Sequence, residues 1–389
     1  MLYLVLLGCP PPSPQPAYIC KADANWVSSP TQPSDVGEEE SFCDFYQFGW
    51  QWFLAQTSPS KDDSDERVFE MHRAFHPKES NQCDMEIQLG REHNIKVLAP
   101  RINKSDLEIK QADQHALYDQ NGNILYYNIW YSSEMCKATD NFVAGTLEIK
   151  ASWIVLKKKK SNFFTIQTSD NQYLGLVGLH MAIWTPKHHE MLWYTWEHKT
   201  NAPLCDGSSK IQEYNFSSKS VAKCLAEKKD CTKYNINIPE DFSGEPPYKA
   251  MPNEVCRMFE NGNQKEDALN GNNNPLNKQV IQDLNDQLVG EKGIISQLPN
   301  NDPMKVWANY HMIGGIWTKN GKPSGTSPVP YKDGTGDKDS PQRGSLELTN
   351  MSMETFEQGK ESFVPNCFGC HHYTEEKPLE VSHIFKYLH

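Results

Sequence analysis

The stretches Tyr173-Leu-Gly-Leu-Val-Gly-Leu-His-Met-Ala-Ile-Trp184 and Met191-Leu-Trp-Tyr-Thr-Trp-Glu-His198 decide the fold of this 389-residue chain. Both are apolar or alternating and rich in aromatic and β-branched residues, a composition that favours buried β-strands. The runs 143–156 and 163–168 have the same character, and short loops separate the four segments. We therefore predict an antiparallel meander, packed into a sheet or sandwich, in an α+β, β-rich fold.

Further elements are predicted on both sides of this meander. The Asn121-Gly122 pair predicts a hairpin turn because both residues accept positive φ. The aromatic residues of 42–53 recur at near-helical spacing, which is typical of core. Strands are predicted over 306–318 and 345–348. A short amphipathic helix ending at Gly290 has an apolar face formed by Val280, Ile281, Leu284 and Leu288.

Changes in composition divide the chain into four regions. The first is rich in Pro, Ser, Asp and Glu and is predicted to be an export-signal remnant followed by a tether. An aromatic-rich antiparallel β region follows it. A polar, cysteine-containing insertion comes next, and the last region combines a helix, a strand and a C-terminal attachment motif. Their predicted bounds are 1–41, 42–204, 205–276 and 277–389.

The charge balance argues against nucleic-acid binding. Acidic residues number 50 against 38 basic ones, giving a formal net charge of −12. No long stretch is basic enough to follow a phosphate backbone. The single basic run, Lys157 to Lys160, is interpreted as a solvated loop between two strands. No segment reaches the ~20 apolar residues that span a bilayer, so membrane contact is expected only through a lipid anchor.

The N-terminus resembles part of a bacterial export signal. Residues 2–7 are apolar, Leu6-Leu7-Gly8-Cys9 matches a lipobox, and a proline-rich spacer follows. The charged start of such signals is missing. Lipidation of Cys9 and a chance match therefore both stay open.

The number of cysteines favours an oxidising compartment. Eleven cysteines are present, and setting aside Cys9, Cys367 and Cys370 leaves an even number that suits up to four disulfides. The pairing cannot be read from sequence. We expect the polar insertion to be held by disulfides because it has too little apolar content to form a core. The remaining cysteines are Cys20, Cys43, Cys83, Cys136, Cys205, Cys224, Cys231 and Cys256.

The segment Cys367-Phe-Gly-Cys-His371 has the spacing of a c-type haem attachment site. Two thiols one helical turn apart can add to the two vinyl groups of a porphyrin, and His371 can then ligate the iron. The sequence thus predicts one covalent haem c on a C-terminal helix, reached through a helix over 351–363. A redox-active thiol pair and half of a zinc site are the alternatives, although the chain contains no second Cys-x-x-Cys for the latter.

The opposite face of the iron needs a ligand from upstream, because few residues follow His371. Met312, Met353 and His311 are the candidates for a second axial ligand, and His180 and His198 are candidates for a distal acid or base. A buried structural histidine is the simpler interpretation of His180. Met351 and His383 complete the set of residues considered.

Several stretches resemble bacterial exported monohaem proteins of the cytochrome c family that carry a C-terminal Cys-x-x-Cys-His motif. The resemblance covers residues 110 to 389. It implies one covalent haem on Cys367 and Cys370 with His371 as axial ligand, and it does not fix the reaction. The stretches that carry it are 145–153, 178–186, 193–203, 348–356 and 366–371.

The predicted function is redox chemistry by a haem protein that is periplasmic, anchored to the outer membrane or secreted. Its partner would be a redox protein or a small molecule oxidised with peroxide or oxygen. The alternative is a surface-attached binding protein with a structural or sensory haem. Its sugar-stacking residues would be Trp184, Trp193 and Trp196. Weaker alternatives are a hydrolase using Glu190 and Glu197 and a metal site formed by His188, His189, Glu190 and His198.

Overall fold

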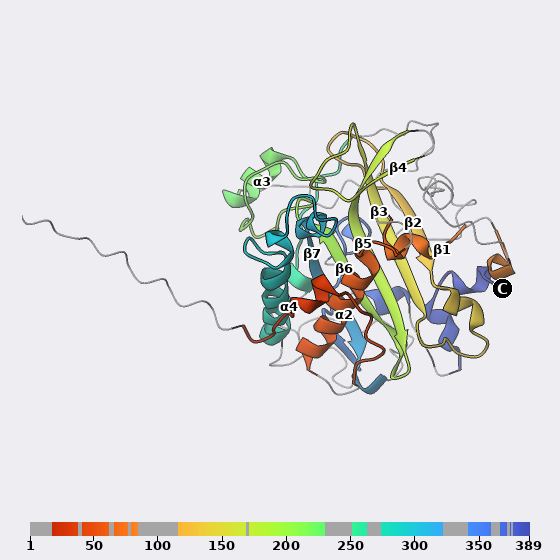
Figure 1. Cartoon of the computed structure of the whole chain (residues 1–389). Coiled ribbons are helices and arrows are strands. Elements are labelled where there is room, and N and C mark those ends of the chain that lie inside the picture. The colour runs from red at the N-terminus through yellow and green to blue at the C-terminus, as the bar shows by residue number, and fades with distance from the viewer. Residues whose placement is uncertain are drawn as a thin grey trace, which may run out of the picture.

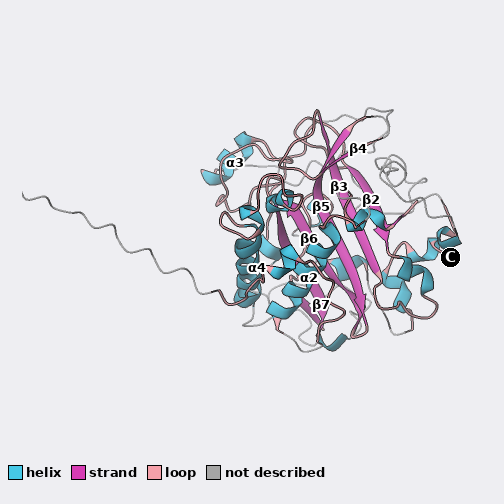
Figure 2. Ribbon diagram, in the orientation of Figure 1, coloured by secondary structure: helices cyan, strands magenta, loops and turns pink. Residues whose placement is uncertain are grey.

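A twisted antiparallel sheet forms the centre of the molecule (Figures 1 and 2). The computed structural model describes residues 18–37, 41–61, 66–76, 79–84, 116–168, 171–229, 251–262, 274–321, 341–358, 366–371, 374 and 376–389. Within them, the sheet has eight strands: seven follow the order β1-β2-β3-β5-β6-β7-β8, and β4 pairs with β5 outside this path. The strands are β1 (Arg73–Ala74), β2 (Tyr126–Tyr131), β3 (Leu147–Leu156), β4 (Thr165–Gln167), β5 (Tyr173–Thr185), β6 (His188–His198), β7 (Tyr310–Thr318) and β8 (Gln342–Gly344).

Helices cover one face of the sheet and short irregular segments cover the other. In Figure 1, α2 and α4 lie in front of the strands and the blue C-terminal segment lies behind them. The α-helices of the described residues are α1 (Asn25–Ser28), α2 (Phe42–Thr57), α3 (Lys219–Ala226), α4 (Asn274–Val289) and α5 (Cys367–Cys370). None of these helices is both long enough and apolar enough to cross a bilayer.

The alternation of β5 and β6 explains why both faces need a cover. Leu179 pairs with Trp196 and Met181 with Tyr194, and all four side chains are buried against the α2 and α4 side. Ala182 and Trp193 point to the opposite face and join a second core with the C-terminal segment. The sheet is therefore buried on both sides, which accounts for the near-continuous apolar character of the two strands.

The core on the α2 side is mostly aromatic. Ser41 caps α2 in a capping box with Asp44, and the helix then presents its rings to the sheet. Phe53 stacks on Trp196 with ring centroids 4.7 Å apart, and Phe45 stacks on Trp317 at 4.2 Å. The interpretation of the aromatic run 42–53 as core is confirmed.

Gly49 gives the ring of Tyr194 room to pack against α2. A Cβ at Gly49 would lie 2.6 Å from a ring carbon of Tyr194, and one at Gly315 would lie 2.5 Å from the same ring. We expect Gly49→Ala to destabilise the protein by about 1–3 kcal/mol through overpacking, although alanine is the better helix former by about 1 kcal/mol. Urea unfolding measures this change. Gln51→Ala in the same helix is the control, and an equal loss of stability there would contradict the packing explanation.

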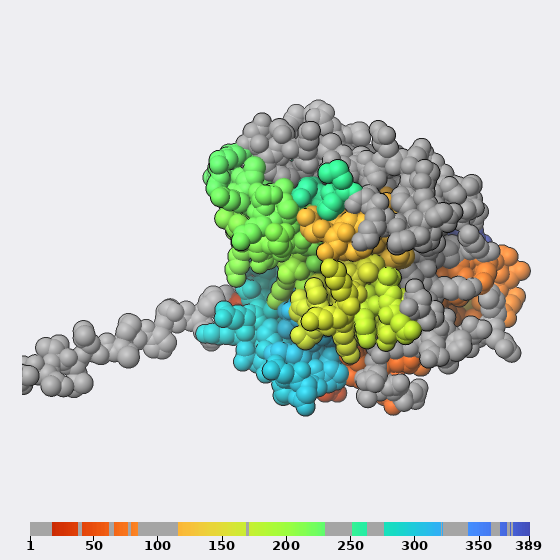
Figure 3. Space-filling view, turned by 90° about the horizontal axis from the view of Figure 1, so that it is seen from above, coloured from red at the N-terminus to blue at the C-terminus, as the bar shows by residue number. Residues whose placement is uncertain are grey.

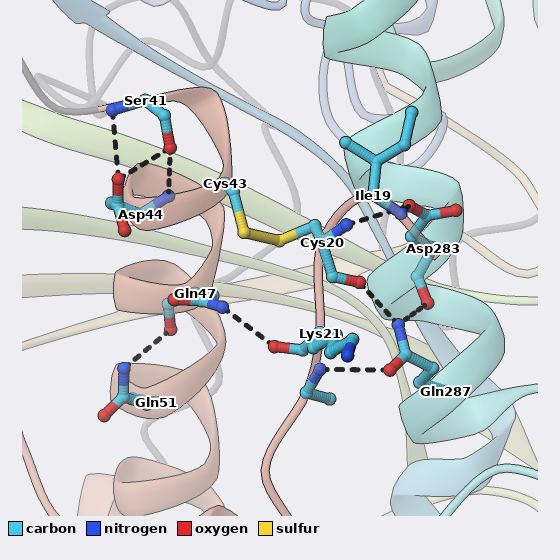
Figure 4. Close-up of a disulfide and its surroundings, with 11 residues drawn as sticks. Ile19, Cys20, Lys21, Ser41, Cys43, Asp44, Gln47, Gln51, Asp283 and Gln287 are labelled. Carbon is cyan, nitrogen blue, oxygen red and sulfur yellow. Dashed lines mark hydrogen bonds between the residues drawn. A yellow bond between two sulfur atoms is a disulfide. The ribbon is translucent and has the colours of Figure 1, made fainter. Parts of the chain in front are cut away.

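The N-terminal residues 18–37 are packed against the fold, so the tether predicted over 1–41 is wrong for this part. Cys20 is fully buried and forms a disulfide with Cys43 of α2. Its backbone N–H donates to Asp283 of α4, and Gln287 donates to the Cys20 carbonyl (Figure 4). The segment is therefore clamped between two helices. Cys9 and the lipobox lie outside the described residues.

Two further disulfides connect distant segments. Cys83 pairs with Cys136, and Cys205 pairs with Cys256 across the polar insertion. Cys224 is also disulfide-bonded. The prediction that disulfides hold the insertion is confirmed for its described part. Such bonds form in oxidising compartments, which is consistent with an exported protein.

Some predicted elements differ in detail. Asn121-Gly122 does form a turn, closed by a bridge between Tyr118 and Ile124, and α4 ends before Gly290 as expected. The strand predicted over 345–348 is wrong, because β8 ends at Gly344 and a turn follows. The described part of the helix predicted over 351–363 consists of turns and a three-residue 3-10 segment. This part is not a regular helix. Instead, the backbone N–H of Asn350 donates to the Glu354 carboxylate, and the Asn350 carbonyl accepts from the backbone N–H of Glu354.

Candidate functional site

The Cys-x-x-Cys-His motif begins in the single helical turn α5, which is attached to the sheet by its flanking residues. Asn366 caps α5 by accepting a hydrogen bond from the backbone N–H of Phe368. The Asn366 amide also donates to the Leu346 carbonyl, and Phe368 is buried in the same core cluster as Ile316 of β7. Local capping and one aromatic anchor thus fix the position of the motif.

The two motif cysteines are not disulfide-bonded. Cys367 is half-buried and Cys370 is exposed. A separation of three residues on a helical turn places both side chains on one side of α5. Burial raises the pKa of the Cys367 thiol well above its ordinary value, and the nearby carboxylate of Glu354 adds to this. Cys367 is therefore a protonated thiol at neutral pH.

His371 is held in one orientation by a backbone acceptor and two rings. Its Nδ1 donates to the carbonyl of Val381 at 2.9 Å, since a carbonyl can only accept. His383 stacks on its ring at 4.0 Å between centroids, and Trp193 of β6 lies at 4.5 Å. Burial lowers the pKa of His371 well below its ordinary value. The ring is thus neutral with its proton on Nδ1, which leaves the Nε2 lone pair for a metal.

A small charged cluster borders the motif. His180 of β5 contacts both carboxylate oxygens of Glu354 at 3.1 Å, and Lys150 of β3 lies 4.0 Å from one of them. Burial alone would raise the pKa of Glu354, but His180 and then Lys150 bring it below its ordinary value. Glu354 is therefore an ionised carboxylate. The charges of Lys150 and His180 also act on His371, where both lower its pKa.

A polar network holds Glu354 at this place. Ser352 bonds to Ser152 of β3 at 2.6 Å and donates to Asn350, whose amide donates to Thr195 of β6. A Cβ at Gly178 would lie 2.2 Å from the Ser352 oxygen, so the close approach requires glycine there. The segment 350–354 is thus fixed on the sheet, next to His180.

The structure brings one of the two predicted acid–base histidines to the motif. His180 belongs to the charged cluster: it is half-buried and hydrogen-bonded to Glu354, a partner that the sequence did not identify. His198 lies elsewhere. It stacks on Phe163 at 4.0 Å, its Nε2 donates to the Asn162 carbonyl, and its contacts include none with the motif.

The three candidates for a second axial ligand are separated from the motif. Met312 is fully buried in the core on the α2 and α4 side, and Met353 is buried in a third cluster with Val177. His311 has its pKa lowered to about 3 by burial and then by Arg257. Among the described residues, none of these three contacts Cys367, Cys370 or His371. His383 is the histidine that the structure places against the motif.

The described residues do not support the sugar-stacking surface, the hydrolase or the separate metal site considered from the sequence. Trp184, Trp193 and Trp196 are 8%, 7% and 0% exposed, so they do not form a sugar-stacking surface. Glu197 is ion-paired with Arg257, whereas Glu190 accepts from His188, so the two carboxylates serve separate buried pairs. In the part of the chain that the structure describes, no three metal-ligating side chains of His, Cys, Asp or Glu gather around one point.

Sequence reasoning missed Glu354, Lys150 and the contact of Trp193 with His371. Glu354 is 174 positions from His180, and a carboxylate in a polar stretch carries no local signal for a partner so distant. Period-2 alternation could have placed Lys150 and His180 on one face, because the two residues pair directly across β3 and β5.

Comparison with protein-family models, with curated proteins and with solved structures finds no match for this chain.

Acid should destabilise the protein partly through His198. Burial lowers the pKa of His198 from 6.5 to about 4, so between these values the unfolded chain binds a proton that the folded chain does not. The contribution of His198 to the free energy of unfolding is fully present above pH 6.5. It is lost as the pH falls toward 4, by about 3 kcal/mol. We expect His198→Gln to flatten the pH dependence of urea unfolding in this window. An unchanged slope would contradict the assignment.

Proposed function

We propose that this chain is an exported c-type haem protein that carries one covalent haem on Cys367 and Cys370. His371 would be an axial ligand, and the protein would act in redox chemistry of the cell envelope. The observation that carries the proposal is a pair of reduced cysteines on one helical turn. Beside them is a neutral histidine whose Nδ1 bonds to a carbonyl and whose Nε2 has its lone pair available.

The contrast between the two kinds of cysteine supports this proposal. Seven of the described cysteines are disulfide-bonded, as expected in an oxidising compartment, whereas Cys367 and Cys370 are not. A pair of thiols one turn apart would readily oxidise there if nothing occupied them. Thioether bonds to a porphyrin would keep both sulfur atoms from forming a disulfide.

The thiol chemistry argues against a redox-active dithiol. Such pairs rely on a thiolate whose pKa is lowered by positive charge or a helix N-terminus. Burial and Glu354 instead raise the pKa of Cys367. A zinc site would need two more ligands in addition to this pair, and the described residues do not assemble them.

The surrounding residues would orient the group and tune it. Haem supplies one-electron chemistry when it is bound. The Val381 carbonyl fixes the plane of the His371 ring and makes its Nε2 a stronger donor, and Trp193 restricts the ring from one side. The ionised Glu354 puts a negative charge near the motif, and Lys150 and His180 beside it compensate that charge.

An absorption spectrum of protein matured in a host with c-type haem machinery tests the proposal. We expect a haem spectrum in the oxidised and the reduced protein. We also expect His371→Ala to keep its haem colour and change the coordination of the iron, because the thioether bonds do not depend on the imidazole. Colourless wild-type protein would contradict the proposal.

A further inference from the structure

A buried hydrogen bond joins the sheet to the C-terminal segment that orients His371. Glu148 of β3 is 8% exposed and Ser382 is 4% exposed. The Ser382 hydroxyl donates to a carboxylate oxygen of Glu148 at 2.8 Å. Ser382 directly follows Val381, whose carbonyl accepts from Nδ1 of His371 at 2.9 Å. One serine therefore lies between the Glu148 carboxylate and the contact that orients the proposed haem ligand.

A single peptide unit connects these two contacts. The Val381 carbonyl and the Ser382 N–H belong to the same planar group, so they turn together. The Ser382 N–H donates to the Leu379 carbonyl at 3.2 Å, and in a trans peptide the Val381 carbonyl then points the opposite way. In that direction it meets His371. The position of the Ser382 side chain, which Glu148 holds, therefore affects the direction of the carbonyl.

Glu148 and the aromatic neighbour of His371 belong to one row across the sheet. Glu148 pairs with Ala182 of β5, and Ala182 pairs with Trp193 of β6. Paired residues share a face, and Ala182 and Trp193 belong to the core that includes the C-terminal segment. The Trp193 ring lies 4.5 Å from the ring of His371. The row therefore restrains the imidazole twice, directly through Trp193 and by way of Ser382 from Glu148.

The C-terminal segment is also anchored independently of Glu148. Val381 and Leu388 are fully buried in the core on this face. The backbone N–H of Cys83 donates to the Leu388 carbonyl at 2.9 Å. The orange segment that includes residues 79–84 lies at the right-hand edge of Figure 3, the edge at which Figure 1 places the C-terminus. Loss of the Glu148 contact is therefore expected to turn one peptide and to leave the segment attached.

The Glu148 carboxyl group lies where an unpaired polar group is costly. Burial raises the pKa of this carboxyl group above its ordinary value, whereas Ser382 and Lys150 act in the opposite direction. A buried carboxyl group that lacks a hydrogen bond destabilises a fold. The contact with Ser382 therefore stays closed in the folded chain.

We propose that Glu148 is a positioning residue for His371. It acts through Ser382, which fixes the direction of the Val381 carbonyl. The carbonyl keeps the imidazole proton on Nδ1, and this contact makes Nε2 the stronger donor to a metal. This role rests on the proposed function, because it takes His371 as the axial ligand. The orientation of the imidazole, in contrast, can be measured with or without haem.

Three variants separate positioning from general damage to the fold. Glu148→Leu/Ser382→Ala removes both partners of the hydrogen bond, so it leaves no buried polar group unpaired and costs little stability. Glu148→Gln keeps an oxygen that accepts from Ser382 and is the conservative rescue. Glu380→Gln is the matched control. It makes the same change in the same segment, at an exposed side chain that pairs with Lys377.

Nitrogen-15 NMR of the full-length protein, labelled at histidine and produced without haem, measures the tautomer of His371 at one neutral pH. We expect the wild type to carry the proton on Nδ1. In the double variant the ratio of the Nδ1–H to the Nε2–H form should fall about fivefold or more, because a hydrogen bond worth about 1 kcal/mol is weakened. Glu148→Gln and Glu380→Gln should stay within about twofold of the wild type.

A redox titration of the haem-loaded variants measures the consequence for the iron. A weaker Nε2 donor favours the reduced state. The double variant should therefore be more than half reduced at the potential at which the wild type is half reduced. Glu148→Gln and Glu380→Gln should titrate with the wild type.

The outcomes distinguish this role from the proposed function. Colourless wild-type protein would reject haem attachment, and the tautomer measured without haem would still decide whether Glu148 orients His371. An unchanged tautomer in the double variant, or an unchanged potential once haem is bound, would overturn the positioning role. An equal shift in Glu380→Gln would also overturn it, because any change in the segment would then have the same effect.

Discussion

Replacing Cys367 and Cys370 together by serine is expected to abolish covalent haem attachment completely. Serine has no thiol to add to a vinyl group, so neither thioether can form. Each single replacement should leave protein with one thioether and a smaller yield. Haem staining after denaturing electrophoresis measures the loss directly.

The fold should survive this change. Cys370 is exposed, Cys367 is half-buried, and the buried anchor of α5 is Phe368, which stays in place. The far-ultraviolet circular dichroism of the double variant should therefore match that of the wild type. Cys205→Ser/Cys256→Ser is the matched control, because it also removes two cysteines but from the insertion. Its folded fraction should stain for haem, and a variant without the motif thiols that still stains would rule out this attachment site.

The second large effect is expected from Arg257→Met. The guanidinium of Arg257 donates to Glu197 at 2.5 Å, and the two side chains are 8% and 1% exposed. Removing the cation leaves a buried carboxylate without its counter-charge, which costs about 3–5 kcal/mol. Glu197 also accepts from the Met351 backbone, so the segment that positions Glu354 should loosen as well. Urea unfolding measures the change in stability.

A double-mutant cycle separates the pair from general damage to the core. Arg257→Met/Glu197→Gln removes both charges and should recover much of the lost stability. Lys377→Met breaks the exposed pair with Glu380 and should leave the unfolding curve unchanged. If the double variant is as unstable as Arg257→Met alone, the loss does not come from the uncompensated charge.

The sheet was predictable because its signals are local. β5 and β6 carry continuous apolar and aromatic runs, and the apolar face of α4 repeats at helical spacing, so neighbouring residues alone contain the pattern. Residues 18–37 were misjudged because what orders them is distant. Cys20 is held by Asp283 of α4 and by Cys43; the cysteine count predicted disulfides but not this pairing, and composition does not identify Asp283 as a partner.

For the candidate site too, the local signals were predictable from the sequence and the contacts between distant residues were not. Cys367, Cys370 and His371 are contiguous, so their spacing could be recognised from the sequence. The contacts of His371 with Val381, His383 and Trp193 depend on the folded chain. His180 was interpreted as a buried structural histidine, and it is half-buried with Glu354 as its hydrogen-bond partner; that partner could not be identified from the sequence because it comes from a segment that crosses the sheet. Met312 was a plausible ligand by residue type alone, and the two faces of the sheet separate it from the motif.

Treatment of the matured, purified protein with acidified acetone tests the central claim most directly. That solvent extracts non-covalent haem and leaves thioether-bound haem on the polypeptide. We predict that the colour stays with the precipitated protein and that its intact mass exceeds the polypeptide mass by one haem. Colour that passes entirely into the acetone, or a polypeptide of unmodified mass, would contradict attachment through Cys367 and Cys370.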